Sequence, residues 1–390
     1  MATLEENGEH WLVNPRNKEK VRKIKAKEVW DLMTKSAWMS GDPGVIFIDE
    51  INRHNATPEV GRMEATNPCG EQPLLPYESC NLGSINLSRI VEGGKIDWEK
   101  LGDNVRNAVH FLDNIVDANK YPLKEIEAIT KANRKIGLGI MGFADMLIKL
   151  GIRYDSEEAL QLAEKLMKFI QEESHKKSVE IGEERGSFPN FQKSIWKDKY
   201  SAMRNATVTT IAPTGSISII AGCSSGIEPM FAISFIRNVL SGTRLFETNP
   251  LFEIMTKERG VYSAQLLEEI AATGSAQKIE KVPEEVKRLF VTALDIKPEW
   301  HVRMQAAFQK YTDNAVSKTV NMPTEATIED VRNVYDLAWK LKCKGVTVFR
   351  YGSKPEQVLY IGEIKTKETT FVTAESDYAG GCPTKTCPFP

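Results

Sequence analysis

An amide, a thiol and a carboxylate alternate within five residues of this chain, at Asn67, Cys69 and Glu71. In an extended or loop conformation, residues two apart point the same way, so these three groups could converge on one small molecule. Gly70 would let the backbone and a ligand approach closely, and Pro68 would stiffen the loop. The alternative is a buried cysteine in an ordinary turn. The carboxylate two residues from the thiol, and a second cysteine eleven residues further on, make that alternative the weaker one.

A second stretch that could bind a ligand is rich in small and hydroxyl-bearing residues. Residues 206–212 alternate like a strand, and a proline then ends the pattern. The turn that follows consists of Pro213, Thr214, Gly215, Ser216, Ile217 and Ser218. A strand that passes through such a turn into a helix leaves backbone N–H groups at the positive end of the helix dipole, which suits an anion. An ordinary Ser/Thr helix cap without a ligand is an equal alternative.

Two more cysteines, Cys382 and Cys387, stand near the end of the chain in a polar segment that begins at about residue 365. They could form half of a zinc site, but such a site needs four ligands, and no other paired Cys or His stands nearby. We therefore predict no metal site and favour a mobile dithiol that carries reducing equivalents. Cys223 and Cys343 stand among apolar residues and are predicted to lie in the core.

Composition limits the class of protein. The 390 residues are 41% hydrophobic and 27% charged, with a formal net charge of −2, which is typical of a soluble globular protein. The charge gives no reason to expect nucleic acid or a membrane as a partner. No apolar run approaches the roughly 18 residues that span a bilayer. Six cysteines do not make a disulfide framework, so we expect a cytoplasmic protein.

The elements that must position these groups follow from apolar periodicity and turn residues. Helices and strands alternate along the chain, which predicts an α/β fold. The predicted elements are a basic hairpin at 9–28, a buried strand at 45–48, helices at 97–121 and 155–181, a capped helix that starts at Thr327, and a strand at 346–350. Gly182 is predicted to help end the second of these helices.

Gly137, Gly139 and Gly142 match the dinucleotide-binding fingerprint in form. The match alone is a weak signal, because another apolar segment follows the last glycine directly. We predict instead that these glycines allow a strand to pack closely against a helix.

Taken together, these segments resemble the catalytic subunit of ribonucleotide reductase. The motifs that carry the resemblance are Asn-Pro-Cys-Gly-Glu at 67–71, Cys-Asn-Leu-Gly-Ser-Ile-Asn-Leu at 80–87, Gly-Leu-Gly-Ile-Met-Gly-Phe-Ala-Asp at 137–145, Pro-Thr-Gly-Ser-Ile-Ser at 213–218, Ser-Ser-Gly-Ile-Glu-Pro at 224–229 and Cys-x4-Cys at 382–387. They are specific in combination and run along nearly the whole chain.

The resemblance implies a fold and a division of the chain. The fold would be the C-terminal half of a ten-stranded α/β barrel with an inserted finger loop, followed by a flexible tail. Residues 1–60 would form a lead-in hairpin, helix and strand. Residues 61–362 would form the partial barrel domain with the finger loop, and residues 363–390 the redox tail.

The resemblance also assigns roles in the reduction of a ribonucleotide, with a ribonucleoside diphosphate as the expected substrate. Cys69 would become a thiyl radical that abstracts the 3′-hydrogen of the ribose, and Glu71 would take the proton of the 3′-hydroxyl. Asn67 would hydrogen-bond the sugar hydroxyls. Cys80 would be one of two thiols that reduce C2′ as water leaves.

Outside the finger loop, the resemblance implies two further functions. The turn at 213–218 would hold the substrate phosphates. Cys382 and Cys387 would re-reduce the active-site disulfide and be recycled by a thioredoxin-like reductant.

The source of the radical follows from the last predicted strand. In reductases that receive the radical from a partner subunit, this strand carries adjacent tyrosines as a relay, and here the corresponding residues are Phe349 and Arg350. Because phenylalanine has no phenol to oxidise, the resemblance favours the adenosylcobalamin-dependent class, with adenosylcobalamin as cofactor. The subunit-dependent class is the alternative.

Family members carry a long segment before the position of residue 1, and it contains the second reducing cysteine. No cysteine precedes Cys69 in this chain, so Cys80 would lack its disulfide partner. We therefore expect one part of a split enzyme, or a fragment, that needs a complementary N-terminal chain. Two other classes compete: a non-catalytic nucleotide-binding or regulatory relative, and a thiol oxidoreductase that uses only Cys382 and Cys387.

Overall fold

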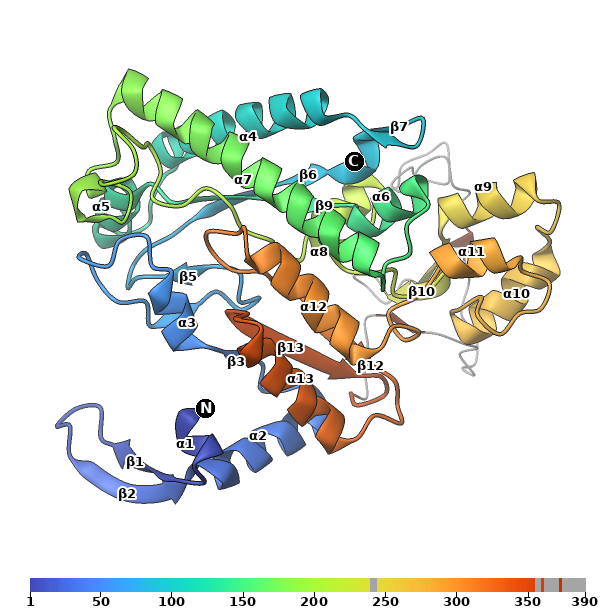
Figure 1. The fold of residues 1–390 in the computed structure, drawn as a ribbon, viewed down its shortest axis with the longest axis horizontal. Coiled ribbons are helices and arrows are strands. Elements are labelled where there is room, and N and C mark those ends of the chain that lie inside the picture. Colours follow the sequence, from blue (N-terminus) through green and yellow to red (C-terminus); the bar gives the residue numbers. More distant parts are fainter. Residues whose placement is uncertain (239–243, 355–358, 361–371, 374–390) are drawn as a thin grey trace, which may run out of the picture.

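The structure is a computed structural model that describes residues 1–238, 244–354, 359–360 and 372–373 (Figure 1). The predicted dithiol, Cys382 and Cys387, lies outside these residues. In the part of the chain that is described, no helix is long and apolar enough to cross a membrane.

Extended segments that run parallel to one another form the centre of the fold. β6 (Asn81–Asn86) pairs with β9 (Ile136–Met141) along its whole length. Parallel bridges then join β9 to residues 207–211 and these to residue 316. Further along the same segment, β12 (Thr319–Met322) pairs with β13 (Gly345–Arg350). The predicted α/β class is therefore confirmed, and the described residues contain a row of parallel strands.

Helices cover this row of strands and enclose the main core. α4 (Trp98–Ala118) packs on β6, on β9 and on α7 (Glu157–Arg185), which in turn contacts α12 (Pro298–Gln309). Figure 1 shows α4 and α7 side by side above the strands. The apolar stripe of α4, including Leu101, Val105 and Leu112, is buried in this core, as its helical spacing predicts.

Local sequence signals locate several element ends correctly. The Asp97 side chain accepts the Lys100 N–H at the start of α4, as an N-cap residue does. Thr327 and Asp330 form the predicted capping box of α13 (Ile328–Lys340). The predicted hairpin is also confirmed as β1 (Glu9–Val13) and β2 (Lys20–Lys25), although α2 (Ala26–Ser40) already begins within its predicted range.

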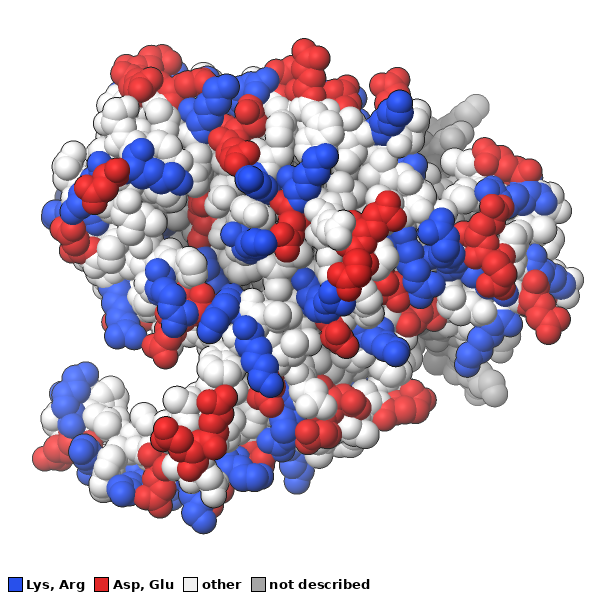
Figure 2. All heavy atoms as spheres, viewed as in Figure 1, with Lys and Arg blue, Asp and Glu red and all other residues white. Residues whose placement is uncertain are grey.

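The hairpin stands apart from the rest of the molecule. Figure 2 shows it as an arm that projects from the body, with basic and acidic side chains interspersed along it. All five residues of β1 are exposed. This distribution agrees with a solvated strand face for the basic residues.

Two predicted elements differ from the structure. The strand expected at 45–48 is limited to β3 (Val45–Ile46), where Ile46 is 39% exposed, and α3 (Ile48–Arg53) begins directly afterwards. β3 is this short because it pairs only with the first two residues of β13. Gly182 lies inside α7 and does not end it. A Cβ at Gly182 would stand 2.9 Å from the backbone nitrogen of Met203, so the glycine permits close packing there.

Gly137 and Gly139 do allow close packing, but their partner is not a helix. A Cβ at Gly139 would meet the carbonyl oxygen of Thr210, and one at Gly137 would lie 2.7 Å from the side chains of Gln72 and Thr210. The predicted helix contact is therefore wrong, because the neighbours are the next parallel segment and the loop that crosses it. Both glycines let those segments approach β9.

The remaining described elements lie around this centre. They are α1 (Ala2–Glu5), β4 (Ala65–Thr66), β5 (Pro73–Leu74), the 3₁₀ helices Leu87–Arg89 and Phe191–Lys193, β7 (Val91–Glu92), β8 (Lys95–Ile96), α5 (Lys124–Asn133), α6 (Phe143–Leu150), α8 (Gly215–Ala221), β10 (Ser234–Asn238), β11 (Arg244–Thr248), α9 (Pro250–Glu258), α10 (Ala264–Thr273), α11 (Glu284–Leu289), β14 (Leu359–Tyr360) and β15 (Val372–Thr373). α9, α10 and α11 bury a smaller apolar cluster together with residues of α6.

One buried carboxylate fixes the middle strand segment to α7. Asp313 accepts hydrogen bonds from Gln171 Nε2 at 2.9 Å and from the Val208 N–H at 2.9 Å, and His175 Nε2 lies 3.0 Å from both of its oxygens. Burial raises the pKa of Asp313, but His175 and these hydrogen bonds outweigh burial and lower the pKa to about 2.

This depressed pKa predicts a pH dependence of stability. A carboxyl group whose pKa is lower in the folded state stabilises the fold above its unfolded pKa, and the stabilisation is lost as pH falls towards the folded pKa. We expect Asp313 to contribute roughly 2 kcal/mol at neutral pH that disappears between about pH 4 and pH 2. Urea unfolding of the wild type and of Asp313→Asn measures it: the difference between them should shrink over that window. A difference that stays constant would contradict the assignment.

Candidate active site

The segment with the amide, thiol and carboxylate forms the tip of a short hairpin. β4 and β5 pair antiparallel, and residues 67–72 connect them. Asn67 closes this loop: its N–H donates to the Gln72 carbonyl at 3.2 Å, and its Oδ1 accepts the Gln72 N–H at 2.9 Å. The Gly70 N–H donates to the Asn67 carbonyl, and Gly70 has a φ of +81°, which favours glycine. We call residues 65–74 the finger hairpin.

The finger hairpin lies against the parallel segments. The carbonyl oxygen of Glu71 accepts the Ala315 N–H at 3.0 Å and the Thr210 hydroxyl at 2.9 Å. These two donors belong to neighbouring parallel segments, so the loop crosses the row of strands where residues 211 and 316 pair. The backbone position of Glu71 is thereby fixed.

The three predicted side chains have different environments. Cys69 is exposed at the tip, whereas Glu71 is only 2% exposed and its Oε2 has no hydrogen-bond partner among the described residues. Burial and the Glu71 carboxylate both raise the pKa of the Cys69 thiol. Asn67 uses its Oδ1 within the loop, which leaves its Nδ2 as the group that could bind a sugar hydroxyl. An unpartnered buried carboxylate oxygen beside a protonated thiol is suited to accept a proton from a bound ligand.

Cys80 approaches the same carboxylate from a different element. It directly precedes β6 and is half-buried, and its thiol donates to the Asn81 carbonyl at 3.4 Å. Burial strongly raises the pKa of the Cys80 thiol; Lys135 opposes this effect, while Glu78 and Glu71 add to it. Because Glu71 raises the pKa of both thiols, its carboxylate lies within electrostatic range of Cys69 and of Cys80.

A buried ion pair next to Cys80 was not predicted from the sequence. Lys135 Nζ lies 2.6 Å from Glu78 Oε2, and both side chains are fully buried. Glu78 also accepts hydrogen bonds from Asn133 Nδ2 at 2.6 Å and from the Leu75 N–H at 2.9 Å. This carboxylate therefore connects the end of the finger hairpin, the start of β9 and the residues before Cys80. The one signal in the sequence that could have indicated this ion pair was a lysine, Lys135, directly before an apolar strand.

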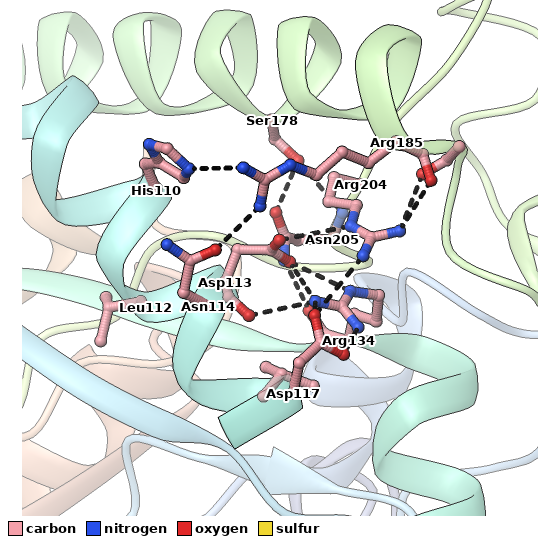
Figure 3. Close-up of polar contacts among 12 residues, drawn as sticks. His110, Leu112, Asp113, Asn114, Asp117, Arg134, Ser178, Arg185, Arg204 and Asn205 are labelled. Atoms are coloured by element: carbon pink, nitrogen blue, oxygen red, sulfur yellow. Dashed lines mark hydrogen bonds and ion pairs between the residues drawn. The ribbon is translucent and has the colours of Figure 1, made fainter. Parts of the chain in front are cut away.

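A network on the other face of the chain holds Lys135 in place. Figure 3 shows Arg134 between Asp113 and Asp117, with Asn205 beside it. Arg134 donates to Asp113 Oδ1 at 2.8 Å and to Asp117 Oδ1 at 2.7 Å, and Asn205 Nδ2 donates to the Arg134 carbonyl at 3.0 Å. Arg134 is thus anchored on α4, so the next residue, Lys135, enters the interior at a fixed position.

The predicted anion-binding turn follows the third parallel segment. Thr214 has a φ of +54°, and α8 begins at the next residue. The Thr214 hydroxyl accepts the Gly226 N–H at 2.7 Å, and the Ser218 and Ser225 hydroxyls lie 2.8 Å apart. Two of the predicted hydroxyl groups therefore hold the loop at 224–229, while Gly215, Ser216 and Ile217 are exposed.

The loop at 224–229 is held in turn by a buried lysine. Lys318 Nζ donates to Glu228 Oε2 at 2.5 Å and to the Thr319 carbonyl, and it lies 3.1 Å from His301 Nδ1. The other Glu228 oxygen accepts the Thr319 N–H at 2.8 Å. Burial lowers the pKa of Lys318, and Glu228 opposes that effect. Lys318 was also missed, because its partner Glu228 is 90 residues away in the sequence.

A cavity of about 230 Å³ lies between the finger tip and the strands. It is lined by Gly44, Val45, Ile46, Thr66, Pro68, Cys69, Gly70, Gln305, Val316, Ser317, Lys318, Gly345, Val346 and Thr347. The exposed thiol of Cys69 therefore faces a space large enough for a small ligand.

Of the two predicted core cysteines, Cys343 is fully buried and Cys223 is half-buried. The described residues contain no group of three or more His, Cys, Asp or Glu that could hold a metal ion.

Comparisons with known proteins define the class of this fold and site. Residues 4–349 match the family described as ribonucleotide reductase, barrel domain, and the chain belongs to that family. A solved structure, the class Id ribonucleotide reductase alpha subunit of Actinobacillus ureae, superposes with a TM-score of 0.71 at 24% identity and covers 84% of this chain and 61% of its own. That likeness shows the fold alone.

Similar sequences carry more specific names. A vitamin B12-dependent ribonucleoside-diphosphate reductase of Thermoplasma acidophilum is 53% identical over 96% of this chain and 51% of its own length. One from Mycobacterium tuberculosis is 49% identical over the whole of this chain and 54% of its own length. The chain thus spans about half the length of the curated relatives that it matches.

Proposed function

We propose that this chain carries the hydrogen-abstracting part of a vitamin B12-dependent ribonucleoside-diphosphate reductase. The observation that carries the proposal is the pair at the finger tip: an exposed thiol at Cys69 and the buried Glu71 carboxylate, one of whose oxygens has no hydrogen-bond partner among the described residues. The names of the relatives support the same activity.

In the proposed reaction the finger hairpin acts on the ribose. A thiyl radical at Cys69 takes the 3′-hydrogen, and Glu71 accepts the proton of the 3′-hydroxyl. Asn67 holds the sugar hydroxyls through its Nδ2. The 2′-hydroxyl then leaves as water, and Cys80 with a second thiol supplies two electrons and two protons and becomes a disulfide. The hydrogen finally returns from Cys69 to C3′ and the proton from Glu71 to the 3′-oxygen, which restores the thiyl radical and the carboxylate.

The proposed cofactor is adenosylcobalamin, which when bound supplies the radical. The cavity beside Cys69 suits a nucleoside-sized part of it, because apolar or small residues such as Gly44, Val45 and Val346 line it together with polar ones such as Gln305. The tyrosine relay of the subunit-dependent class has no counterpart at Phe349 and Arg350, and Arg350 instead donates to the Trp38 carbonyl at 3.0 Å.

We further propose that a complementary N-terminal chain completes the barrel to ten strands. β6 pairs with β9 on one side and has no strand partner on its other side within the described ranges. An open edge of this kind can accept another strand. The added chain would also carry the thiol that pairs with Cys80.

The other assignments complete the cycle. The substrate phosphates would bind at Pro213, Thr214, Gly215, Ser216, Ile217 and Ser218. Cys382 and Cys387 would re-reduce the disulfide of Cys80 and be recycled by a thioredoxin-like reductant in the cytoplasm.

The proposal predicts that activity depends on two additions. With adenosylcobalamin, cytidine diphosphate and dithiothreitol, the isolated chain should give no deoxycytidine diphosphate, and adding the N-terminal half of a B12-dependent relative should restore it. Chromatography of the products measures this. Hydroxocobalamin, which lacks the adenosyl group, is the control. Turnover by the isolated chain would refute the split enzyme, and turnover only with a metal-bearing radical subunit would favour the subunit-dependent class.

A further inference from the structure

Gln305 has an unusual position at the cavity beside Cys69. It belongs to α12, in the helical layer, yet its side chain is fully buried and reaches between two parallel segments. Its Nε2 donates to the Val316 carbonyl at 3.0 Å and to the Gly345 carbonyl at 2.8 Å. Both residues line the cavity, as does Gln305 itself.

These two hydrogen bonds fix the orientation of the Gln305 amide group. A carbonyl oxygen can only accept, so the atom between Val316 and Gly345 must be the NH₂ group of Gln305. The amide oxygen, Oε1, is then left over, and it has no hydrogen-bond partner among the described residues. A buried acceptor without a partner costs free energy that a donor on a ligand would recover.

The charge of the cavity narrows the ligand class. Lys318 is the one charged residue in its lining, and its ammonium group is 2.5 Å from Glu228. Burial and Glu71 keep the Cys69 thiol protonated by raising its pKa. A cavity whose one charged lining residue is paired, and whose lining includes a residue with an unpartnered acceptor, suits a neutral group with a hydrogen-bond donor; a phosphate would meet no unpaired cation among these lining residues.

We propose that Gln305 is a ligand-contacting residue whose Oε1 accepts a hydrogen bond from an uncharged nucleoside in the cavity beside Cys69. The ligand class rests on the proposed function, which supplies two sources of such a group: the nucleoside of the substrate and the adenosyl group of the cofactor. A hydroxyl or exocyclic amine of the nucleoside provides the donor.

The chain contains a matched control for this residue. Gln309 lies one turn further along α12, is also buried, and its Nε2 donates to the Thr312 and Asn314 carbonyls at 3.3 and 3.2 Å. Its Oε1 likewise has no hydrogen-bond partner within the described ranges, but Gln309 does not line the cavity. Gln305→Met and Gln309→Met therefore each remove two hydrogen bonds to backbone carbonyls. Only Gln305→Met also removes an acceptor from a residue that lines the cavity.

The test measures protection of the Cys69 thiol in the full chain. N-ethylmaleimide labelling of the Cys69 peptide, followed by mass spectrometry, gives the affinity for cytidine, 5′-deoxyadenosine and pyrophosphate. We expect a nucleoside to protect the wild type, Gln305→Met to weaken that affinity about tenfold, and Gln309→Met to change it less than about twofold. Protection by cytidine alone would assign the site to the nucleoside of the substrate, and protection by 5′-deoxyadenosine alone would assign it to the adenosyl group of the cofactor.

Three results would overturn the proposal: no protection by either nucleoside, equal weakening in both variants, or protection by pyrophosphate that matches the nucleosides. If Gln305→Met does not fold, hydrogen exchange of the wild type with and without a nucleoside tests the proposal instead. A nucleoside bound in the cavity must slow exchange at residues 67–70 and 345–347. Unchanged exchange there would also overturn it. None of these measurements requires turnover, so a failure of the proposed reaction is recognised separately.

Discussion

Cys69→Ser is expected to abolish ribonucleotide reduction by the assembled enzyme, with a loss of about a thousandfold or more. A serine O–H bond is much stronger than a thiol S–H bond, so forming an oxyl radical at serine and returning its hydrogen to carbon are both unfavourable, and the hydroxyl cannot replace the thiol as a carrier of the radical. Because the residue is exposed at the finger tip, the fold should be unchanged. Product formation and the thermal unfolding midpoint, measured on the same preparation, test both statements.

The control for this variant removes a thiol elsewhere. Cys343 is fully buried between α13 and β13 and does not itself line the cavity. Cys343→Ala should lower the unfolding midpoint, because it leaves a small void, while turnover of the folded fraction stays near that of the wild type. Turnover by Cys69→Ser comparable with that of Cys343→Ala would remove Cys69 from the mechanism.

Lys135→Met is expected to destabilise the fold by about 3–5 kcal/mol, because it leaves the Glu78 carboxylate buried without its partner. The ammonium and carboxylate lie 2.6 Å apart and both side chains are fully buried, so water cannot replace the missing charge. The free energy of unfolding in urea measures the effect. The double variant, Lys135→Met with Glu78→Gln, should recover part of the loss, since it removes both charges.

An exposed ion pair provides the comparison. Lys310 Nζ lies 2.7 Å from Glu164, but the two side chains are 55% and 40% exposed. Lys310→Met should therefore change the stability far less than Lys135→Met, because solvent screens exposed pairs. Equal effects of the two substitutions, or a double variant less stable than Lys135→Met, would contradict the role assigned to the buried pair.

Features that depend on neighbouring residues in the sequence were predicted well. The capping box at Thr327 needs only a residue three positions away, and the apolar stripe of α4 repeats along one helix. The finger loop was also found from its residue types. Its geometry differs from the simple alternation, because Asn67 folds back to bind Gln72, so Glu71 is buried while Cys69 is exposed.

Features that depend on distant residues could not be predicted. Gly182 continues a helix because the backbone near Met203 requires space, and Gly139 faces the Thr210 carbonyl and not a helix. Lys135 and Glu78 are 57 residues apart in sequence, and nothing in either segment identifies the other as its partner. The same holds for Gln305, whose two acceptors belong to segments that come together only in the folded chain.

Within the described residues β6 has a strand partner on one side only, and this has a consequence for any strand that would pair with its other side. Cys80 directly precedes β6, so a chain added at this edge places its own side chains relative to that thiol. Side chains of a strand alternate between its two faces, and a shift of one residue turns each of them to the opposite face. The register of pairing at β6 would therefore determine the distance from Cys80 to a thiol on the added strand. Correct assembly and a reducible disulfide would be achieved together or lost together.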